Sequence, residues 1–246
     1  MKKLLIIGGV MVGLGIIGVI VTAFFLGNIV TAGVNNFAPK ITLTKVVLSG
    51  ASISPLNGSG TLRGLVIANP KGWSDANLCL IGKIYIDVEP FSVLRDHIVV
   101  NEIVVEQPEF LYETRIVASN VNDLLKNIDQ TTGGGKGGPE ATTKSGQPIK
   151  IVVKKFALKN GRVTLGVGPT AITIPMPDVT LTDIGTAEGG ITPGALAFAI
   201  VRGVTPNIVA ASMQALGKVG GTAGAAVVEG VKQIGKGIKG LFGGKK

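Results

Sequence analysis

Hydrophobic positions follow three different patterns along this chain of 246 residues. Residues 4–34 form a run without a charged side chain, a pattern typical of a membrane-spanning helix. Residues 41–193 contain short runs rich in Val and Ile in which apolar and polar positions alternate, which predicts strands. Near the end of the chain, apolar residues recur at helical spacing among lysines and glycines. These patterns predict an N-terminal transmembrane anchor (1–37), a β domain (38–193) and a Gly-rich basic amphipathic tail (194–246).

The uncharged run is long enough to cross a bilayer. As a helix, its 31 residues would extend about 46 Å, against a hydrocarbon core of ~30 Å. Lys2 and Lys3 precede it, so the positive-inside rule keeps the N-terminus in the cytoplasm and exports the rest of the chain. The alternative is a cleaved signal peptide, because Val30-Thr31-Ala32 resembles a cleavage site. Signal peptides usually have apolar cores of only ~7–15 residues, so we expect a single-pass anchor.

Two glycines in the run point to a dimer contact. Gly9 and Gly13 form a GxxxG pattern, which lets two membrane helices approach closely. Glycine is also common in membrane helices that do not associate. A homodimer through the anchor is therefore one hypothesis, and an anchor that contains these glycines without associating is the alternative.

Strand patterns dominate the middle of the chain. Alternation is clearest where Gly82, Ile84, Ile86 and Val88 alternate with Lys83, Tyr85, Asp87 and Glu89. Asn160-Gly161 lies between two other apolar runs and predicts a tight hairpin turn. About eight or nine strands are expected, with no alternation of strands and helices that would favour a parallel sheet. The predicted fold class is mainly β: an antiparallel curved sheet, forming a groove or a sandwich.

One short helix interrupts the strands. Ser119 is a favourable N-cap residue, and Val121, Leu124, Leu125 and Ile128 follow at the spacing of one helix face. This pattern predicts a helix over 119–128. Residues 129–148 are rich in Gly, Thr, Lys and Pro without an apolar period, which predicts a flexible linker.

The inward side chains of the strands have two interpretations. They can pack against a second sheet as an ordinary core, or they can line an open groove that a lipid would fill. The low aromatic content of 4% fits the lining of an acyl-chain groove. The candidate groove residues are Ile84, Ile86, Val88, Val152, Phe156 and Leu158.

The tail carries a second membrane pattern. On a helix, its apolar residues gather on one face and its lysines on the other, which suits the surface of an anionic membrane. Gly235 and Gly237 lie among them, and each glycine costs ~1 kcal/mol of helix stability, so we expect the tail to order on binding. A helix docked on its own domain is the alternative. The candidate membrane-surface residues are Val231, Lys232, Ile234, Lys236, Ile238, Lys239, Leu241 and Phe242.

The net charge of +9 is unevenly distributed. Residues 1–74 carry +6 and 194–246 carry +6, while 75–129 carry −6. Membrane phosphate explains two basic ends more simply than nucleic acid does, and aromatic residues are too few for base-stacking platforms. We therefore expect membrane phospholipid as a partner, and no nucleic acid.

Residues for common active sites are scarce. A single Cys and a single His leave Cys79 and His97 as the one possible thiol–imidazole pair, and a lone apolar Cys is usually a buried hydrophobe. The carboxylates of 87–113 alternate with apolar residues, as on a solvated sheet face. We expect no enzyme, no cofactor and no specific metal site.

Several segments resemble a known family. They are the anchor, then APKIT at 38–42, SPLNGSGTLRGLVIANPKGW at 54–73, SNVNDLL at 119–125 and GLFGG at 240–244. In this order they resemble the short AsmA-like envelope proteins of Gram-negative bacteria.

The resemblance implies an inner-membrane anchor that carries a curved, groove-like β domain in the periplasm. Large relatives are thought to conduct phospholipid between membranes, as chorein-type lipid-transfer proteins do. This chain is much shorter, so its residues 41–193 would make one short segment of such a groove. The predicted function is non-enzymatic lipid handling or envelope assembly, with envelope proteins as further partners; the alternative is a tethered scaffold for protein interactions.

Overall fold

The computed structural model of the protein describes residues 18, 25–115, 118–134, 142 and 146–218. Most of the predicted anchor, with Gly9 and Gly13, and all the candidate tail residues (231–242) lie outside these residues. The elements are β1 (Val46–Ile53), β2 (Ser59–Ala68), β3 (Asn77–Val88), η1 (Pro90–Leu94), β4 (Ile98–Glu106), β5 (Glu109–Tyr112), α2 (Asn120–Thr132), β6 (Ile151–Lys159), β7 (Arg162–Leu165), β8 (Ile172–Pro175), β9 (Val179–Ile184) and α3 (Pro193–Lys218). Residues 25–42 are also helical.

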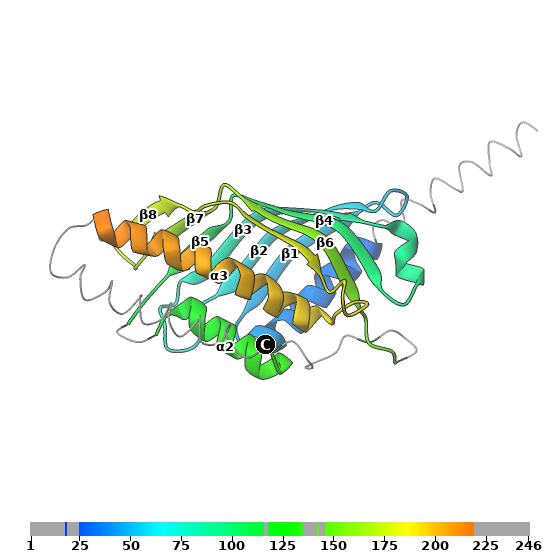
Figure 1. Ribbon diagram of the computed structural model, residues 1–246, viewed down its shortest axis with the longest axis horizontal. Coiled ribbons are helices and arrows are strands. Elements are labelled where there is room, and N and C mark those ends of the chain that lie inside the picture. The colour runs from blue at the N-terminus through cyan, green and yellow to red at the C-terminus, as the bar shows by residue number, and fades with distance from the viewer. Residues whose placement is uncertain (1–17, 19–24, 116–117, 135–141, 143–145, 219–246) are drawn as a thin grey trace, which may run out of the picture.

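All the strands belong to one curved sheet, which Figure 1 shows along its length. β1 pairs with β2, and β2 with β3. β4 and β5 both pair with β3 in one register, because Lys83 lies opposite Glu106 and Cys79 opposite Phe110. In the same way, β6 and β7 are two parts of one long strand, and β9 and β8 are two parts of the neighbouring long strand. The nine strands are therefore six long strands, three of which are interrupted midway.

The prediction of a mainly β fold is confirmed, but the prediction of a purely antiparallel sheet is wrong. β6 runs parallel to β4, and β7 runs parallel to β5. A parallel neighbour needs a crossover connection, and the segment from α2 to β6 provides it. The helix predicted from Ser119 onward therefore belongs to the crossover that joins two parallel strands. With a single sheet, the curved groove describes the fold and the sandwich does not.

The interruptions of the strands fall on one transverse line across the sheet, which we call the crease. It consists of Ser49, Gly64, Gly82, Gln107, Asn160 and Pro177, as the pairs on either side of each residue show. Gly64, Gln107 and Asn160 have positive φ angles of 64°, 50° and 55°. Left-handed residues in a strand break the two-residue alternation and bend the strand, as in a β-bulge.

The crease explains how both halves of the sheet keep apolar side chains inside. On β3, Cys79 and Ile81 are buried before the crease, and Ile84 is buried after it, so the inward positions change from odd to even numbers. Asn160-Gly161 is accordingly a bend within one long strand, and the predicted hairpin is wrong. Asn and Gly favour a positive φ in either setting, so the dipeptide alone could not distinguish a turn from a bend.

A second irregular line crosses the sheet farther along. Asn101 is bulged out of the β3–β4 ladder, because Asp87 pairs with Glu102 but Val88 pairs with Val100. Asp183, in β9, has a φ of 55°. Between them, Lys154 and Lys155 are both exposed on β6, and Lys154 Nζ donates to Asn101 Oδ1 at 2.8 Å. The inward positions of β6 therefore change here as well.

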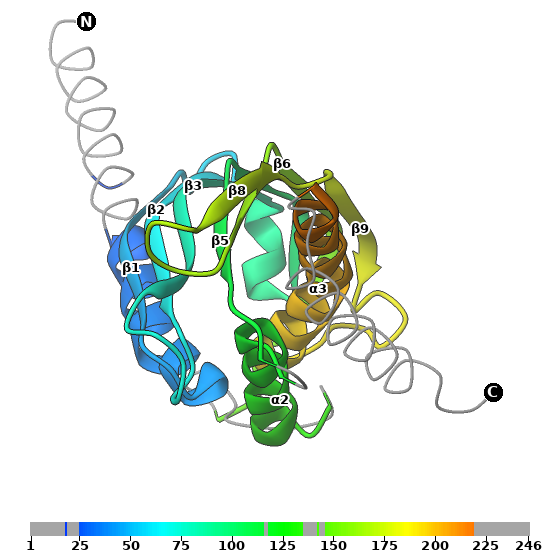
Figure 2. The ribbon, with the colours of Figure 1, turned by 90° about the vertical axis from the view of Figure 1, so that its left-hand side faces the viewer.

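Two helices cover the concave face of the sheet. Figure 2 shows the sheet curling from β1 to β9 around α3, with α2 beside it. α3 packs against α2 and against β5, β7, β8 and β9. Ser119 caps α2 by accepting a hydrogen bond from Asn122 N at 3.2 Å, which confirms the predicted start, and the helix extends to Thr132. The predicted linker of 129–148 thus begins inside α2.

Residues 25–42 cover the free edge of the sheet at β1. The side chain of Asn35 accepts from Leu48 N at 2.7 Å and donates to Leu48 O at 3.1 Å, so its amide replaces a neighbouring strand. Gly27 lies against the backbone of Ala51, where a Cβ would not fit. The last part of the predicted membrane run, from Gly27 to Val34, is therefore packed on the sheet.

α3 occupies residues that the sequence analysis placed in the tail. It starts at Pro193, where Gly194 lies so close to Thr132 that a Cβ would come within 2.9 Å of Thr132 Cγ2. Its segment Pro193–Ala215 is, among the described residues, the one helix long and apolar enough to cross a membrane. In the structure this helix packs against the sheet and α2, with 39% of the apolar segment buried.

Candidate functional site

An apolar groove lies between the concave face of the sheet and the helices. Its free volume is about 310 Å³. Strand residues on both sides of the crease line one wall of the groove, and residues of α2 and α3 line the other. The lining residues are Leu62, Leu65, Ile67, Leu78, Cys79, Ile81, Ile84, Ile86, Ile103, Val105, Phe110, Val121, Leu124, Phe156, Leu158, Ala197, Ile200, Val201, Val204, Thr205 and Ile208.

The lining offers almost no polar group. Thr205 Oγ1 donates to Val201 O at 2.6 Å, so this hydroxyl is satisfied within α3. The Cys79 thiol is the other group with hydrogen-bonding capacity, and burial raises its pKa from 9.0 to about 12. A thiol with such a pKa stays protonated and unreactive at neutral pH. The groove can therefore bind an apolar group and lacks the donors that a polar ligand needs.

Four of the six candidate groove residues line this groove: Ile84, Ile86, Phe156 and Leu158. Val88 packs against the core without lining the groove, because it lies beyond the bulge at Asn101. Val152 is buried but lies outside both the groove lining and the core cluster, while its neighbour Val153 belongs to that cluster. The cause is the second irregular line at Lys154, across which the alternation predicted from Phe156 fails.

The structure keeps Cys79 and His97 apart. Cys79 lies opposite Phe110 on β5, whereas His97 directly precedes the first residue of β4. The two positions are about 13 residues apart along one long strand, which is roughly 40 Å at ~3.3 Å per residue. These two side chains do not form a thiol–imidazole pair.

The carboxylates of the strands pair with basic residues at the surface. Glu102 Oε1 lies 2.8 Å from Lys155 Nζ, and Glu89 Oε1 lies 3.0 Å from Arg95 Nη1. All four side chains are at least one third exposed, so these pairs contribute little to stability. Among the described residues, no three His, Cys, Asp or Glu side chains come together in a way that could hold a metal ion.

A polar cluster, formed by Asn69, Ser74, Glu113 and Asn120, lies at the end of the sheet where β2 is joined to β3. Glu113 Oε1 accepts hydrogen bonds from Asn69 Nδ2 at 2.6 Å and from Ser74 Oγ at 2.5 Å. Asn120 is fully buried, and its Nδ2 donates to Asn69 Oδ1 and to Leu111 O, both at 2.8 Å. The cluster ties the β2–β3 loop to the start of α2.

Trp73 extends this connection at the surface. Its Nε1 donates to Asp123 Oδ2 at 3.0 Å, and the guanidinium of Arg115 lies 4.6 Å from the centre of its ring. In the sequence, the segment 69–73 was informative only as part of the family resemblance. Its fixed contacts are with residues about 40 to 50 positions later, as with Glu113 and Asp123, and spacing along the sequence does not reveal such partners.

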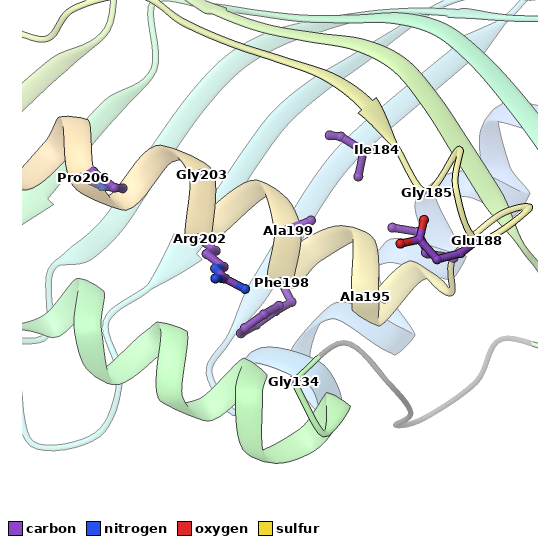
Figure 3. Close-up of a pocket in the computed structure, with 11 residues that line it drawn as sticks. Gly134, Ile184, Gly185, Glu188, Ala195, Phe198, Ala199, Arg202, Gly203 and Pro206 are labelled. Atoms are coloured by element: carbon purple, nitrogen blue, oxygen red, sulfur yellow. The ribbon is translucent and has the colours of Figure 1, made fainter. Parts of the chain in front are cut away.

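A second pocket of about 620 Å³ lies on the other side of α3. Figure 3 shows Phe198 and Arg202 projecting from α3 on the side of α2, with Glu188 on the loop before the helix. The guanidinium of Arg202 lies 5.9 Å from the centre of the Phe198 ring. The residues of α3 that line this pocket differ from those that line the groove, so the helix separates two cavities.

Comparison with known proteins adds no assignment. No protein-family model matches the chain, and no curated protein matches it. The resemblance to short AsmA-like envelope proteins thus stays a prediction from the sequence.

Proposed function

We propose that the protein is a non-enzymatic lipid-handling protein of the AsmA-like type, which holds a phospholipid acyl chain in the apolar groove. It is anchored in the inner membrane by its N-terminal segment, with the bulk of the chain in the periplasm. The observation that carries the proposal is the groove itself, a cavity of about 310 Å³ lined almost entirely by apolar side chains. Its one hydroxyl, that of Thr205, is already hydrogen-bonded within α3.

The energetics of the cavity support an apolar occupant. Cavities lined by Leu, Ile and Phe stay dry and take up apolar guests. An acyl chain in the groove would cover the apolar lining that otherwise faces empty space or water.

The size of the groove sets the form of lipid handling. The sheet is about 12 residues long at β3, or roughly 40 Å at ~3.3 Å per residue. One copy is thus long enough to shelter an acyl chain. The proposed role is to take up or present single lipids for envelope assembly.

Photo-crosslinking of the full chain tests this proposal. The chain would be reconstituted in phospholipid nanodiscs that contain a phosphatidylethanolamine with a diazirine in its acyl chain. Adducts are expected on peptides that carry groove residues such as Ile86, Ile103 and Val201. Adducts confined to the uncharged run 4–34 would overturn the proposal.

Two alanines on α3 provide a matched pair of variants. Ala197 faces the groove, whereas Ala199 lines the pocket on the other side of the helix. Ala197→Phe fills the groove and should reduce the groove adducts severalfold, while Ala199→Phe should leave them unchanged. Equal yields from both variants, or a dry groove together with a stable protein partner in native mass spectrometry, would favour the tethered scaffold.

A further inference from the structure

The most exposed hydrophobic side chains gather at the end of the molecule opposite the polar cluster. Among the described residues, five large hydrophobic side chains are more than 60% exposed: Phe25, Ile29, Leu56, Phe91 and Leu94. Val93 is 57% exposed in the same short helix as Phe91 and Leu94. We call these six residues the apolar end.

Contacts between backbone segments bring the apolar end together from three parts of the chain. Gly27 lies against Ala51 near the end of β1, which places Phe25 beside the β1–β2 turn that carries Leu56. Gly58, at the end of that turn, lies so close to η1 that a Cβ would come within 3.3 Å of Pro90 Cδ. Figure 1 shows η1, the β1–β2 turn and the start of helix 25–42 at one end of the sheet.

The exposed side chains of η1 are held outward by a built turn. Ser92 is fully buried; its Oγ donates to Glu89 O at 2.6 Å and accepts from Val99 N at 2.9 Å. Arg95 N closes the turn by donating to Ser92 O at 2.9 Å. With Ser92 fixed inward, Phe91, Val93 and Leu94 have no place in the core. A solvated turn does not need three large apolar side chains, so this surface fits an apolar environment.

The chain before Phe25 indicates what that environment is. Because Gly27 is packed on the sheet, the part of the uncharged run that precedes this contact is 4–26. As a helix, these residues would extend about 35 Å, which covers the ~30 Å hydrocarbon core. Such a span ends beside Phe25, inside the apolar end. The bilayer surface therefore meets the molecule where its exposed hydrophobic residues lie.

From this coincidence we propose that the apolar end inserts into the interface of the bilayer that the N-terminal segment crosses. Leu56, Phe91, Val93 and Leu94 enter the boundary between headgroups and acyl chains, and the anchor holds them there. The sheet then stands on the membrane by this end, with the polar cluster pointing away. This inference rests on the N-terminal anchor of the proposed function, and it does not depend on what fills the groove.

Depth-dependent quenching in the full chain tests the inference. Leu94→Cys and Val167→Cys would each be made in a Cys79→Ala background and labelled with an environment-sensitive fluorophore. Val167 is 49% exposed in the β7–β8 turn, at the opposite end of the sheet, and serves as the matched control. In nanodiscs of phosphatidylethanolamine and phosphatidylglycerol, a doxyl-labelled lipid should quench the label at position 94 severalfold more strongly than the label at 167.

Iodide in the water phase should give the reverse order, with the label at 167 quenched more strongly. Equal quenching of both labels by the lipid quencher would overturn the inference. So would protection of position 94 that appears only when the protein-to-lipid ratio is raised, because that result assigns the surface to a second copy of the chain. Leu94 is 83% exposed, so its substitution leaves the core intact.

Discussion

The two ends of the curved sheet are built in opposite ways. At one end, Asn69, Ser74 and Glu113 form a hydrogen-bonded cluster with the buried Asn120, which joins a loop to α2. At the other end, Leu56, Phe91 and Leu94 are exposed around a turn that Ser92 fixes. The ends are about 12 residues apart along β3, roughly 40 Å at ~3.3 Å per residue.

The difference assigns the ends different environments. Buried polar groups that satisfy one another stabilise a structure surrounded by water, and losing one partner leaves the others unsatisfied. A cluster of exposed hydrophobic side chains contributes little to folding and marks a surface that can bind an apolar partner. Substitutions at the polar cluster should therefore change stability, while substitutions at the apolar end should change only membrane contact. The following predictions test this division.

The largest expected difference is chemical. Burial raises the pKa of Cys79 from 9.0 to about 12, so in the native chain at pH 8.5 it should react with iodoacetamide several hundred-fold (~10²–10³) more slowly than an exposed cysteine introduced by Leu94→Cys. Peptide mass spectrometry measures both rates in one chain. Comparable rates would show that the groove is open to water at Cys79.

The same raised pKa has a consequence for stability. The unfolded chain loses the Cys79 proton near its ordinary pKa of 9.0, before the folded chain does, so native stability should fall as pH rises from about 9 to 12. Cys79→Ala should remove this part of the alkaline dependence in denaturant titrations.

The next largest effect concerns the polar cluster. Asn120→Ala removes the partners of Asn69 Oδ1, Leu111 O and Glu113 N in a fully buried place. At ~1–3 kcal/mol for each unsatisfied group, the free energy of unfolding should fall by about 3 kcal/mol or more. Denaturant unfolding of the full chain measures it. Lys126→Ala, on the exposed side of α2, is the control and should change it by less than ~0.5 kcal/mol.

An intermediate effect is expected at the crease between the two ends. Gly64 has a φ of 64°, and a Cβ there would lie 2.5 Å from Ser49 Oγ; Gly82, on the next strand, has open space around its Cα. Gly64→Ala should cost ~1–2 kcal/mol of stability, because alanine is strained at positive φ. Gly82→Ala should be nearly neutral. Equal effects at the two positions would contradict the bend described for β2.

The smallest effect on stability is expected at the apolar end. Phe91→Ser and Leu94→Ser remove side chains that are 72% and 83% exposed, so the free energy of unfolding should change by less than ~0.5 kcal/mol. A loss comparable to that of Asn120→Ala would show that η1 belongs to the folding core and would remove the contrast between the ends.

The sequence was informative where the contacts are local. Ser119 identified the start of α2, and the alternation around Ile84 and Ile86 identified two groove residues, because a cap and a strand face depend on neighbours within a few positions. It misled where alternation is interrupted: Val152 and Asn160-Gly161 were misread because a bulge or a left-handed residue changes the inward face. α3 was missed because Pro193–Ala215 is predominantly apolar and has no clear amphipathic period.

Asn35 determines how copies of this protein can be arranged. A bare edge strand is a template on which another chain can polymerise, but here a side-chain amide already occupies the Leu48 backbone groups at the β1 margin. At the opposite margin, Pro175 and Pro177 interrupt the donors of the β8–β9 line. Each margin thus carries a feature that opposes strand addition, which disfavours sideways growth of a longer conduit from this unit. End-on-end stacking is the other arrangement, and with the proposed membrane docking a second copy would join at the end that carries the polar cluster.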